Sequence, residues 1–128
     1  EALGDGVFAD GNGMSLTQTG NENDAAITLA TSAESSGNIA MLEQTGDLNL
    51  LDLVVNGSDN IISIMQEGNE NWVTADDGGT FEMTASGTDF SVEQMGNFNL
   101  VTGSITGVDG AVLITQVGDF NVATVVQN

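Results

Sequence analysis

The chain alternates between apolar and polar residues over short segments, which is the pattern of β-strands that are buried on one face. Clear examples are residues 39–44 (IAMLEQ), 61–66 (IISIMQ) and 111–116 (AVLITQ). Segments of the same period follow some of them, such as residues 50–55 (LLDLVV) and 122–126 (VATVV). The alternation therefore predicts pairs of strands, each with one apolar and one polar face.

A six-residue motif, Gln-x-Gly-[Asn/Asp]-x-Asn, joins the two strands of each pair. Its five copies cover residues 18–23, 44–49, 66–71, 94–99 and 116–121, and the surrounding glycines give a repeat of about 22 residues. Each repeat is a strand, a turn, a second strand and another turn. The pattern predicts an all-β fold, a flattened β-solenoid of about five strand-turn-strand rungs that stacks into cross-β fibres.

The expected solenoid covers residues 11–128 as one domain. Residues 1–10, which are rich in glycine and acids, are predicted to form a flexible or subunit-linking segment. Two of the connecting turns are long, at residues 31–37 and 76–87. The rungs are expected at approximately residues 11–36, 37–56, 57–86, 87–106 and 107–128.

Counting by twos from the motif separates an inward face from an outward one. The outward face carries mainly polar side chains, namely Thr17, Glu43, Ser63, Glu93 and Thr115 on the first arm and Asp52, Thr74, Thr102 and Thr124 on the second. The predicted core consists of Leu16, Ala40, Leu42, Ile62, Ile64, Phe90, Val92, Val112, Ile114, Ala25, Ile27, Leu29, Leu51, Leu53, Val55, Val73, Ala75, Val101, Ile105, Ala123 and Val125.

The repeated motif residues are expected to have structural roles. In rungs about 4.8 Å apart, an inward amide can bond to the same amide of the next rung, and glycine suits a sharp turn because it accepts positive φ. An inward Asn can also bind backbone groups of the turn. The predicted ladders are Gln18, Gln44, Gln66, Gln94 and Gln116, and Asn23, Asn49, Asn71, Asn99 and Asn121, with turn glycines Gly20, Gly46, Gly68, Gly96 and Gly118.

This repeat resembles the curlin repeat of the major and minor curli subunits, the secreted bacterial functional amyloids. The resemblance covers residues 11–128 and implies an extracellular fibre subunit of a biofilm or cell-surface adhesion matrix. It also implies a nucleator subunit and a secretion machinery as partners. Curlin repeats tend to end in a second Gln, which only Gln127 provides here, whereas Val55 and Ile105 hold that place in other rungs. The basic residues and tyrosines of many curlins are absent.

The charge of the chain excludes several classes of partner. It has 19 carboxylates, no Lys, Arg or His, and a formal charge of −19, so it cannot neutralise nucleic-acid phosphates or anionic membranes, and no apolar run suits membrane insertion. Five rungs at about 4.8 Å make about 24 Å, or roughly one charge per 1.3 Å, denser than duplex DNA at roughly 1.7 Å. We expect assembly to be promoted by salt, mild acid or divalent cations acting as counterions, without a cofactor.

The expected function is that of a structural subunit that polymerises with itself, head to tail, by templated edge addition. Neither end of the solenoid is expected to carry the polar cap that blocks a strand edge. No His or Cys is present and no carboxylate pair stands out, so an enzyme is not expected.

Three other interpretations remain open. The chain could be a soluble, monomeric β-solenoid binding module, such as an ice-binding protein with outward Thr residues. Residues 10–13 (DGNG) resemble part of a calcium loop, which would suit a calcium-binding adhesin. Trp72, Met65, Met95 and Leu113 could form a surface for lateral packing of fibres.

Overall fold

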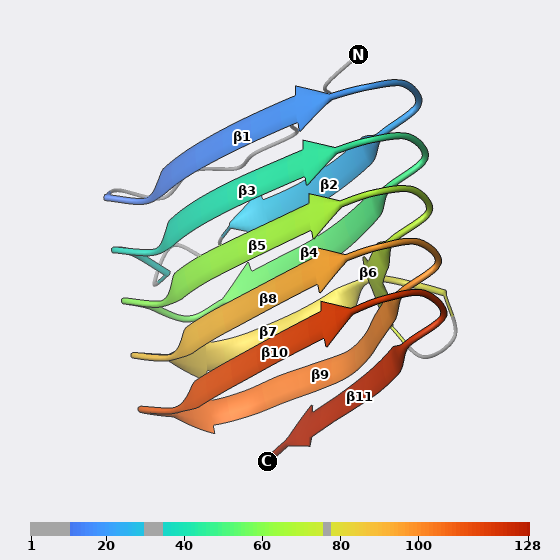
Figure 1. The fold of residues 1–128 in the computed structure, drawn as a ribbon. Coiled ribbons are helices and arrows are strands. Elements are labelled where there is room, and N and C mark those ends of the chain that lie inside the picture. The colour runs from blue at the N-terminus through green and yellow to red at the C-terminus, as the bar shows by residue number, and fades with distance from the viewer. Residues whose placement is uncertain (1–10, 30–34, 76–77) are drawn as a thin grey trace.

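The computed structural model describes residues 11–29, 35–75 and 78–128, which form a flattened β-solenoid, as the alternation predicted (Figure 1). Residues 1–10 lie outside the described residues. Two parallel sheets face each other. Sheet A has the order β1 (Gly13–Thr19), β3 (Ile39–Thr45), β5 (Ile61–Glu67), β8 (Asp89–Met95) and β10 (Ala111–Val117). Sheet B contains β2 (Asp24–Leu29), β4 (Leu50–Asn56), β6 (Trp72–Thr74), β7 (Phe81–Ser86), β9 (Leu100–Val108) and β11 (Val122–Gln127).

Every strand pair is parallel, and the register places equivalent repeat positions directly above one another. Gln18 is in register with Gln44, which is in register with Gln66, and the same column continues through the remaining motif glutamines. Backbone bonds continue the stacking through the turns, where the Gly46 N–H donates to the Thr19 carbonyl at 2.9 Å. Each rung therefore templates the backbone of its neighbour.

The core lies between the two sheets, and almost every residue predicted for it points inward. The core side chains from the three middle rungs are buried, whereas those of the first strand and of the last rung are half-buried because no further described rung covers them. These half-buried residues include Leu16, Val112, Ile114, Ala123 and Val125. The packing of short apolar side chains from both sheets is what the alternation requires.

The prediction of one long turn at residues 76–87 was wrong. The chain leaves sheet B after Thr74, closes a short excursion with a bond from the Ala75 N–H to the Gly79 carbonyl at 2.8 Å, and re-enters the sheet as β7. Phe81, Met83 and Ala85 are buried in the core, and Phe81 stacks on Phe90 with ring centroids 5.1 Å apart. The same alternation that predicted the other strands is present in FEMTA, but the Asp-Gly-rich residues before it favoured a continuous turn.

Three residues near this excursion also differ from the prediction. Ala75, expected in the core, is half-buried because it begins the excursion. Thr74 and Thr102, expected on the exposed face, are only 2% and 6% exposed. Their hydroxyls find partners close by, since that of Thr74 donates to the Ala75 carbonyl at 3.1 Å and that of Thr102 lies 3.3 Å from the Thr124 hydroxyl. Of the other long turn, residues 31–34 lie outside the described residues.

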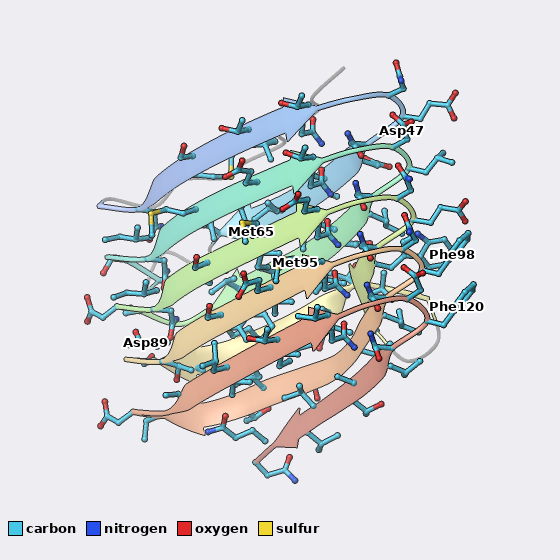
Figure 2. All side chains as sticks on the ribbon, in the orientation of Figure 1. Asp47, Met65, Asp89, Met95, Phe98 and Phe120 are labelled. Atoms are coloured by element: carbon cyan, nitrogen blue, oxygen red, sulfur yellow. The ribbon has the colours of Figure 1, made fainter. Side chains whose placement is uncertain are left out.

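The outer faces of the two sheets are separate surfaces. Met65 and Met95 project from the outer face of sheet A (Figure 2), where Leu113 also lies, whereas Trp72 belongs to the outer face of sheet B. These four residues therefore do not form one continuous surface. None of the described segments is a helix with the length and apolarity that a membrane crossing needs.

Candidate functional site

The five motif glutamines form one continuous ladder through the interior. The side-chain amides of the first four donate to the Oε1 of the next rung, with distances of 2.6 Å from Gln18 to Gln44, 2.8 Å from Gln44 to Gln66, and 2.9 Å for the two following steps. The same amides also bond across to the opposite arm, as from Gln66 Nε2 to the Asn71 carbonyl at 2.8 Å. The ladder therefore ties the two sheets together as well as the rungs.

The five motif asparagines form a second predicted ladder, which has the opposite polarity. The N–H of Asn49 donates to Asn23 Oδ1 at 3.0 Å, and that of Asn71 donates to Asn49 Oδ1 at the same distance. Each side-chain Nδ2 also binds a turn carbonyl, such as Asn49 Nδ2 to the Gly68 carbonyl at 2.8 Å. The ladder continues through Asn99 and Asn121.

The motif glycines form the corner that these asparagines clamp. All five have positive φ, between 103° and 122°. The variable residue before the motif Asn also has positive φ, from 54° to 60°, although glycine fills none of these positions, which are Glu22, Leu48, Glu70, Phe98 and Phe120. Non-glycine residues rarely adopt this conformation, and here it is held by backbone bonds between adjacent corners, such as Phe98 N–H to the Asn69 carbonyl at 3.0 Å.

A third ladder, which the six-residue motif does not include, lies at the start of the sheet A strands. Asn12, Asn38 and Asn60 stack here, with the Asn38 N–H donating to Asn12 Oδ1 at 2.8 Å and the Asn60 N–H donating to Asn38 Oδ1 at 3.1 Å. Asn12 belongs to the DGNG segment, of which Asp10 lies outside the described residues. The signal was available in the sequence, because each of these asparagines precedes the motif Gln by six residues.

The fourth motif position forms a ladder on the exposed corner. Asp47 Oδ1 accepts the Asn21 N–H at 2.8 Å, and the Asp47 N–H donates to Asn69 Oδ1 at 2.9 Å. Asp119 Oδ1 accepts the Asn97 N–H at 2.8 Å in the same way. Backbone N–H groups therefore donate hydrogen bonds to these two carboxylates, in a chain that has no cationic side chain to pair with them.

The third ladder is interrupted at Thr88, which provides a prediction about stability. Thr88 is 1% exposed; its N–H donates to Asn60 Oδ1 at 3.0 Å, but its hydroxyl has no partner. In Thr88→Asn the side-chain amide should bind the Gly107 carbonyl, as Asn60 Nδ2 binds the Ala85 carbonyl at 2.7 Å. We expect the free energy of unfolding, measured with urea, to rise by about 1–2 kcal/mol.

Thr88→Val is the matched control, because it removes the unpartnered hydroxyl at constant shape and adds no hydrogen bond. We expect a change of less than about 1 kcal/mol for this variant. A loss of stability in Thr88→Asn, or an equal gain in both variants, would contradict the role of the ladder.

The two outer edges of the described solenoid carry backbone groups for another rung. The first residue of each sheet B arm donates its N–H to the motif Asn carbonyl of the next rung at 2.8–2.9 Å, as Leu100 does to Asn121. Val122 holds this position in the last rung, where no described strand offers an acceptor. At the other edge, the Asn23 carbonyl holds the acceptor position without a donating strand among the described residues.

The amide ladders leave matching groups at the same edges. At the first edge, Gln18 Nε2 donates to Gln44 Oε1, and no described donor reaches Gln18 Oε1. At the last edge, Gln116 Nε2 donates only to the Leu100 carbonyl at 3.1 Å. Asn121 donates to Asn99 Oδ1, but its own Oδ1 has no donor among the described residues. A second copy placed in line with the first would continue both ladders with the polarity that they have inside the chain.

The carboxylates are kept apart from one another and from these edges. In no described strand pair is one carboxylate in register with another; Glu43, for example, lies between Thr17 and Met65. The strands of the two outermost rungs, β1, β2, β10 and β11, contain a single carboxylate, Asp24. The strands at both outer edges are therefore almost uncharged, whereas other carboxylates of these rungs, such as Glu22 and Asp119, lie in the turns.

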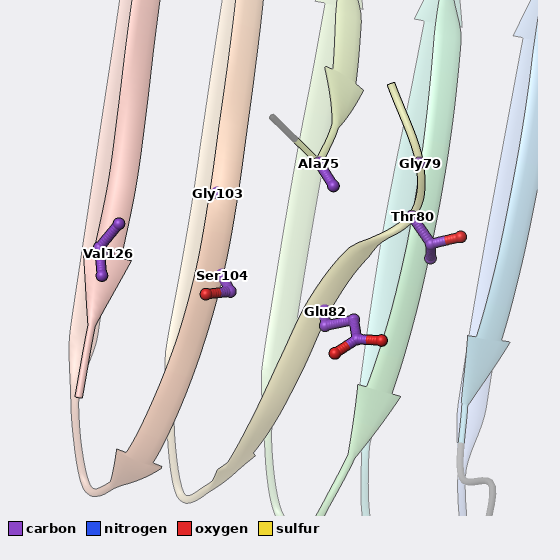
Figure 3. A pocket seen from close by; sticks show the side chains of 7 residues that line it. All are labelled: Ala75, Gly79, Thr80, Glu82, Gly103, Ser104 and Val126. Atoms are coloured by element: carbon purple, nitrogen blue, oxygen red, sulfur yellow. The ribbon is translucent and has the colours of Figure 1, made fainter. Parts of the chain in front are cut away.

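A pocket lies on the outside of sheet B where the chain makes its excursion (Figure 3). Among the described residues that line it, Glu82 is the one with an ionisable side chain, and the others are Ala75, Gly79, Thr80, Gly103, Ser104 and Val126. Among the described residues, no group of three His, Cys, Asp or Glu side chains lies close enough together to hold a metal ion.

Comparison of the chain with protein-family models, with curated proteins and with solved structures found no match in any of the three.

Proposed function

We propose that this chain is the structural subunit of an extracellular, amyloid-like fibre that grows head to tail by edge addition. The observation that carries the proposal is the character of the two outer edges, whose strands are almost free of charge and whose ladders are complementary. A soluble sheet protein usually protects an open edge with charged side chains on the edge strands, and here Asp24 is the one such side chain on the described outer strands.

In this proposal, the fibre end is the template for the next subunit. Its backbone edge and its Gln and Asn amides provide ordered partners for the outer rung of an incoming subunit, whose far edge then becomes the next template. The contact joins two different surfaces of the subunit and does not close on itself, which gives an open filament. The function needs no catalysis and no cofactor.

The extracellular location and the role in a biofilm or surface matrix rest on the resemblance of the motif to curlin repeats. A nucleator subunit and a secretion machinery are proposed as partners on the same ground. The runner-up is a soluble, monomeric β-solenoid that binds a ligand, for which the ladders would have a purely structural role.

Electron microscopy and fibre diffraction of the purified chain test the proposal. The chain is dissolved as a monomer, moved into neutral buffer with salt, and incubated with and without preformed seeds. We expect unbranched filaments with a meridional spacing of about 4.8 Å, which grow faster when seeds are present. A folded monomer that resists seeding would overturn the proposal and favour the soluble binding module.

Salt should accelerate this growth. The carboxylates of successive subunits repel one another and no cationic side chain compensates them, so screening lowers the barrier to addition. We expect the seeded elongation rate at neutral pH to fall several-fold when the ionic strength is lowered tenfold. Divalent cations at equal ionic strength should increase the rate further, and a faster rate at low salt would contradict this prediction.

A further inference from the structure

The position of Gln127 in the last rung points to a specific role at the junction between two subunits. Gln127 is in register with Ile105, in an inward column that continues through Met83, Val55 and Leu29. It is thus the one amide in a column of apolar side chains. It is half-buried, and its amide makes no hydrogen bond within the described residues. If a further rung covers this edge, the amide loses its contact with water and then needs a hydrogen-bond partner.

The Gln127 amide lies over Gly110, which belongs to the neighbouring column of stacked residues in the same rung. A Cβ atom built on Gly110 would lie 2.6 Å from Gln127 Nε2, so the amide occupies the space that a side chain at residue 110 would need. In the other four rungs this column contains Asn12, Asn38, Asn60 and Thr88. The only rung without a side chain in this column is therefore the rung in which Gln127 fills the place.

The missing side chain would be needed where the next subunit stacks. At three internal steps, the backbone N–H of this column donates to the side-chain oxygen of the preceding rung, at 2.8, 3.1 and 3.0 Å. A second copy that follows the last rung would bring the Asn12 N–H over Gly110, which has no side-chain oxygen to accept it. Gln127 Oε1, 3.5 Å from the ideal Cβ position of Gly110, is the side-chain oxygen at that place.

We propose that Gln127 determines the specificity of the head-to-tail junction, by supplying the amide oxygen that receives the Asn12 N–H of the next subunit. This inference rests on the proposed fibre function and identifies a residue of that same interface. Gln127 thus substitutes, from the far end of the rung, for the side chain that Gly110 lacks. The last rung is adapted to be followed by a rung that begins with Asn12.

Two substitutions reproduce the internal arrangement at this end of the solenoid. Gln127→Leu extends the apolar column and removes the amide, and Gly110→Asn extends the third ladder. Gly110 does not have positive φ, and its column already accepts Asn, so an Asn side chain fits there once Gln127 no longer fills the space. The double variant should restore the junction that Gln127→Leu alone impairs.

Seeded elongation on wild-type seeds measures the effect, with the critical monomer concentration as the readout. We expect Gln127→Leu to raise this concentration about tenfold because a buried N–H loses its acceptor. Gly110→Asn alone should change it by less than about threefold, because the Gln127 amide ends a flexible side chain that can move aside and the Asn then supplies the oxygen. The double variant should return to within about twofold of the wild type. Thr84→Ser, on the exposed face of β7, controls for the effect of a substitution as such.

The outcomes separate this inference from the proposed function. If the wild type forms seeded filaments and Gln127→Leu elongates equally well, the role of Gln127 is wrong and the fibre function stands. If Gln127→Leu is impaired and the double variant is not rescued, the role of Gln127 as a replacement for a side chain at residue 110 is wrong. If the wild type forms no filaments, the fibre function itself fails, and the inference fails with it. Circular dichroism of each monomer shows whether a loss of folding explains the result.

Discussion

Gly118→Ala should stop the growth of filaments while leaving the monomer folded. A Cβ atom on any of the other four motif glycines would overlap the carbonyl oxygen of the next rung, as at Gly68 with Gly96. At Gly118, the nearest atom would be Asn121 Nδ2 at 3.8 Å, because no described rung follows. If a second copy stacks there, its Gly20 carbonyl comes to the place where the Ala methyl group stands.

The expected cost at the junction is large. Overlap with a backbone carbonyl that cannot move away costs about 3 kcal/mol or more, which corresponds to an affinity for the fibre end about 100-fold weaker. The monomer loses only about 1–2 kcal/mol because Ala is strained at the φ of 103° that Gly118 adopts. Seeded elongation and the thermal unfolding of the monomer are the two measurements.

Two further glycine variants make the result interpretable. Gly78→Ala places a methyl group at a positive φ of 76° with no atom within 4 Å, in the excursion and away from both edges, so it should elongate normally. Gly68→Ala introduces the same overlap inside the chain and should prevent folding. Normal elongation of Gly118→Ala would mean that the next copy is not seated in line with the last rung.

Gln66→Leu should be the most destabilising substitution in the amide ladder. Gln66 is fully buried, and its amide donates to Gln94 Oε1 at 2.9 Å and to the Asn71 carbonyl at 2.8 Å, while its Oε1 accepts the Gln44 amide at 2.8 Å. Leu fills the same space but leaves these buried groups without partners. We expect a loss of about 3–5 kcal/mol, a large part of the total stability of a small domain.

Gln18→Leu is the matched control, because Gln18 lies in the first rung and is half-buried. It breaks one bond, to Gln44 Oε1 at 2.6 Å, and should cost about 1 kcal/mol. Urea unfolding of the monomer at low ionic strength compares the two variants. Equal losses would indicate that the interior ladder is no stronger than its end, contrary to the cooperative network that the structure suggests.

Much of the candidate site could be predicted from the sequence. The motif predicted the Gln18–Gln116 and Asn23–Asn121 ladders and the glycine corners, and in the structure these residues are hydrogen-bonded from rung to rung or have positive φ. The third ladder was missed because Asn38 and Asn60 precede the strands, at a place that is also common for turn residues. Thr88 and Gly110 further hide the regularity in two of the five rungs.

The sequence by itself determined most of the inward-facing positions and the glycine corners between the strands. Both follow from local rules, because strand side chains alternate with period two and a sharp reversal requires glycine. This is why the alternation alone correctly places Leu51, Ile64 and Val92 in the core.

Only the tertiary structure decided which residues of successive rungs are stacked on one another. The steps between motif glutamines are 26, 22, 28 and 22 residues. The extra residues in the two longer steps can be accommodated as a longer turn or as an excursion followed by a strand. Burial of Phe81 against Phe90 favours the second arrangement. The separation of the carboxylates between rungs and the approach of Gln127 to Gly110 likewise depend on contacts between residues distant in sequence. Such contacts form only when whole rungs stack, because hydrogen bonds and side-chain packing between rungs fix the register cooperatively.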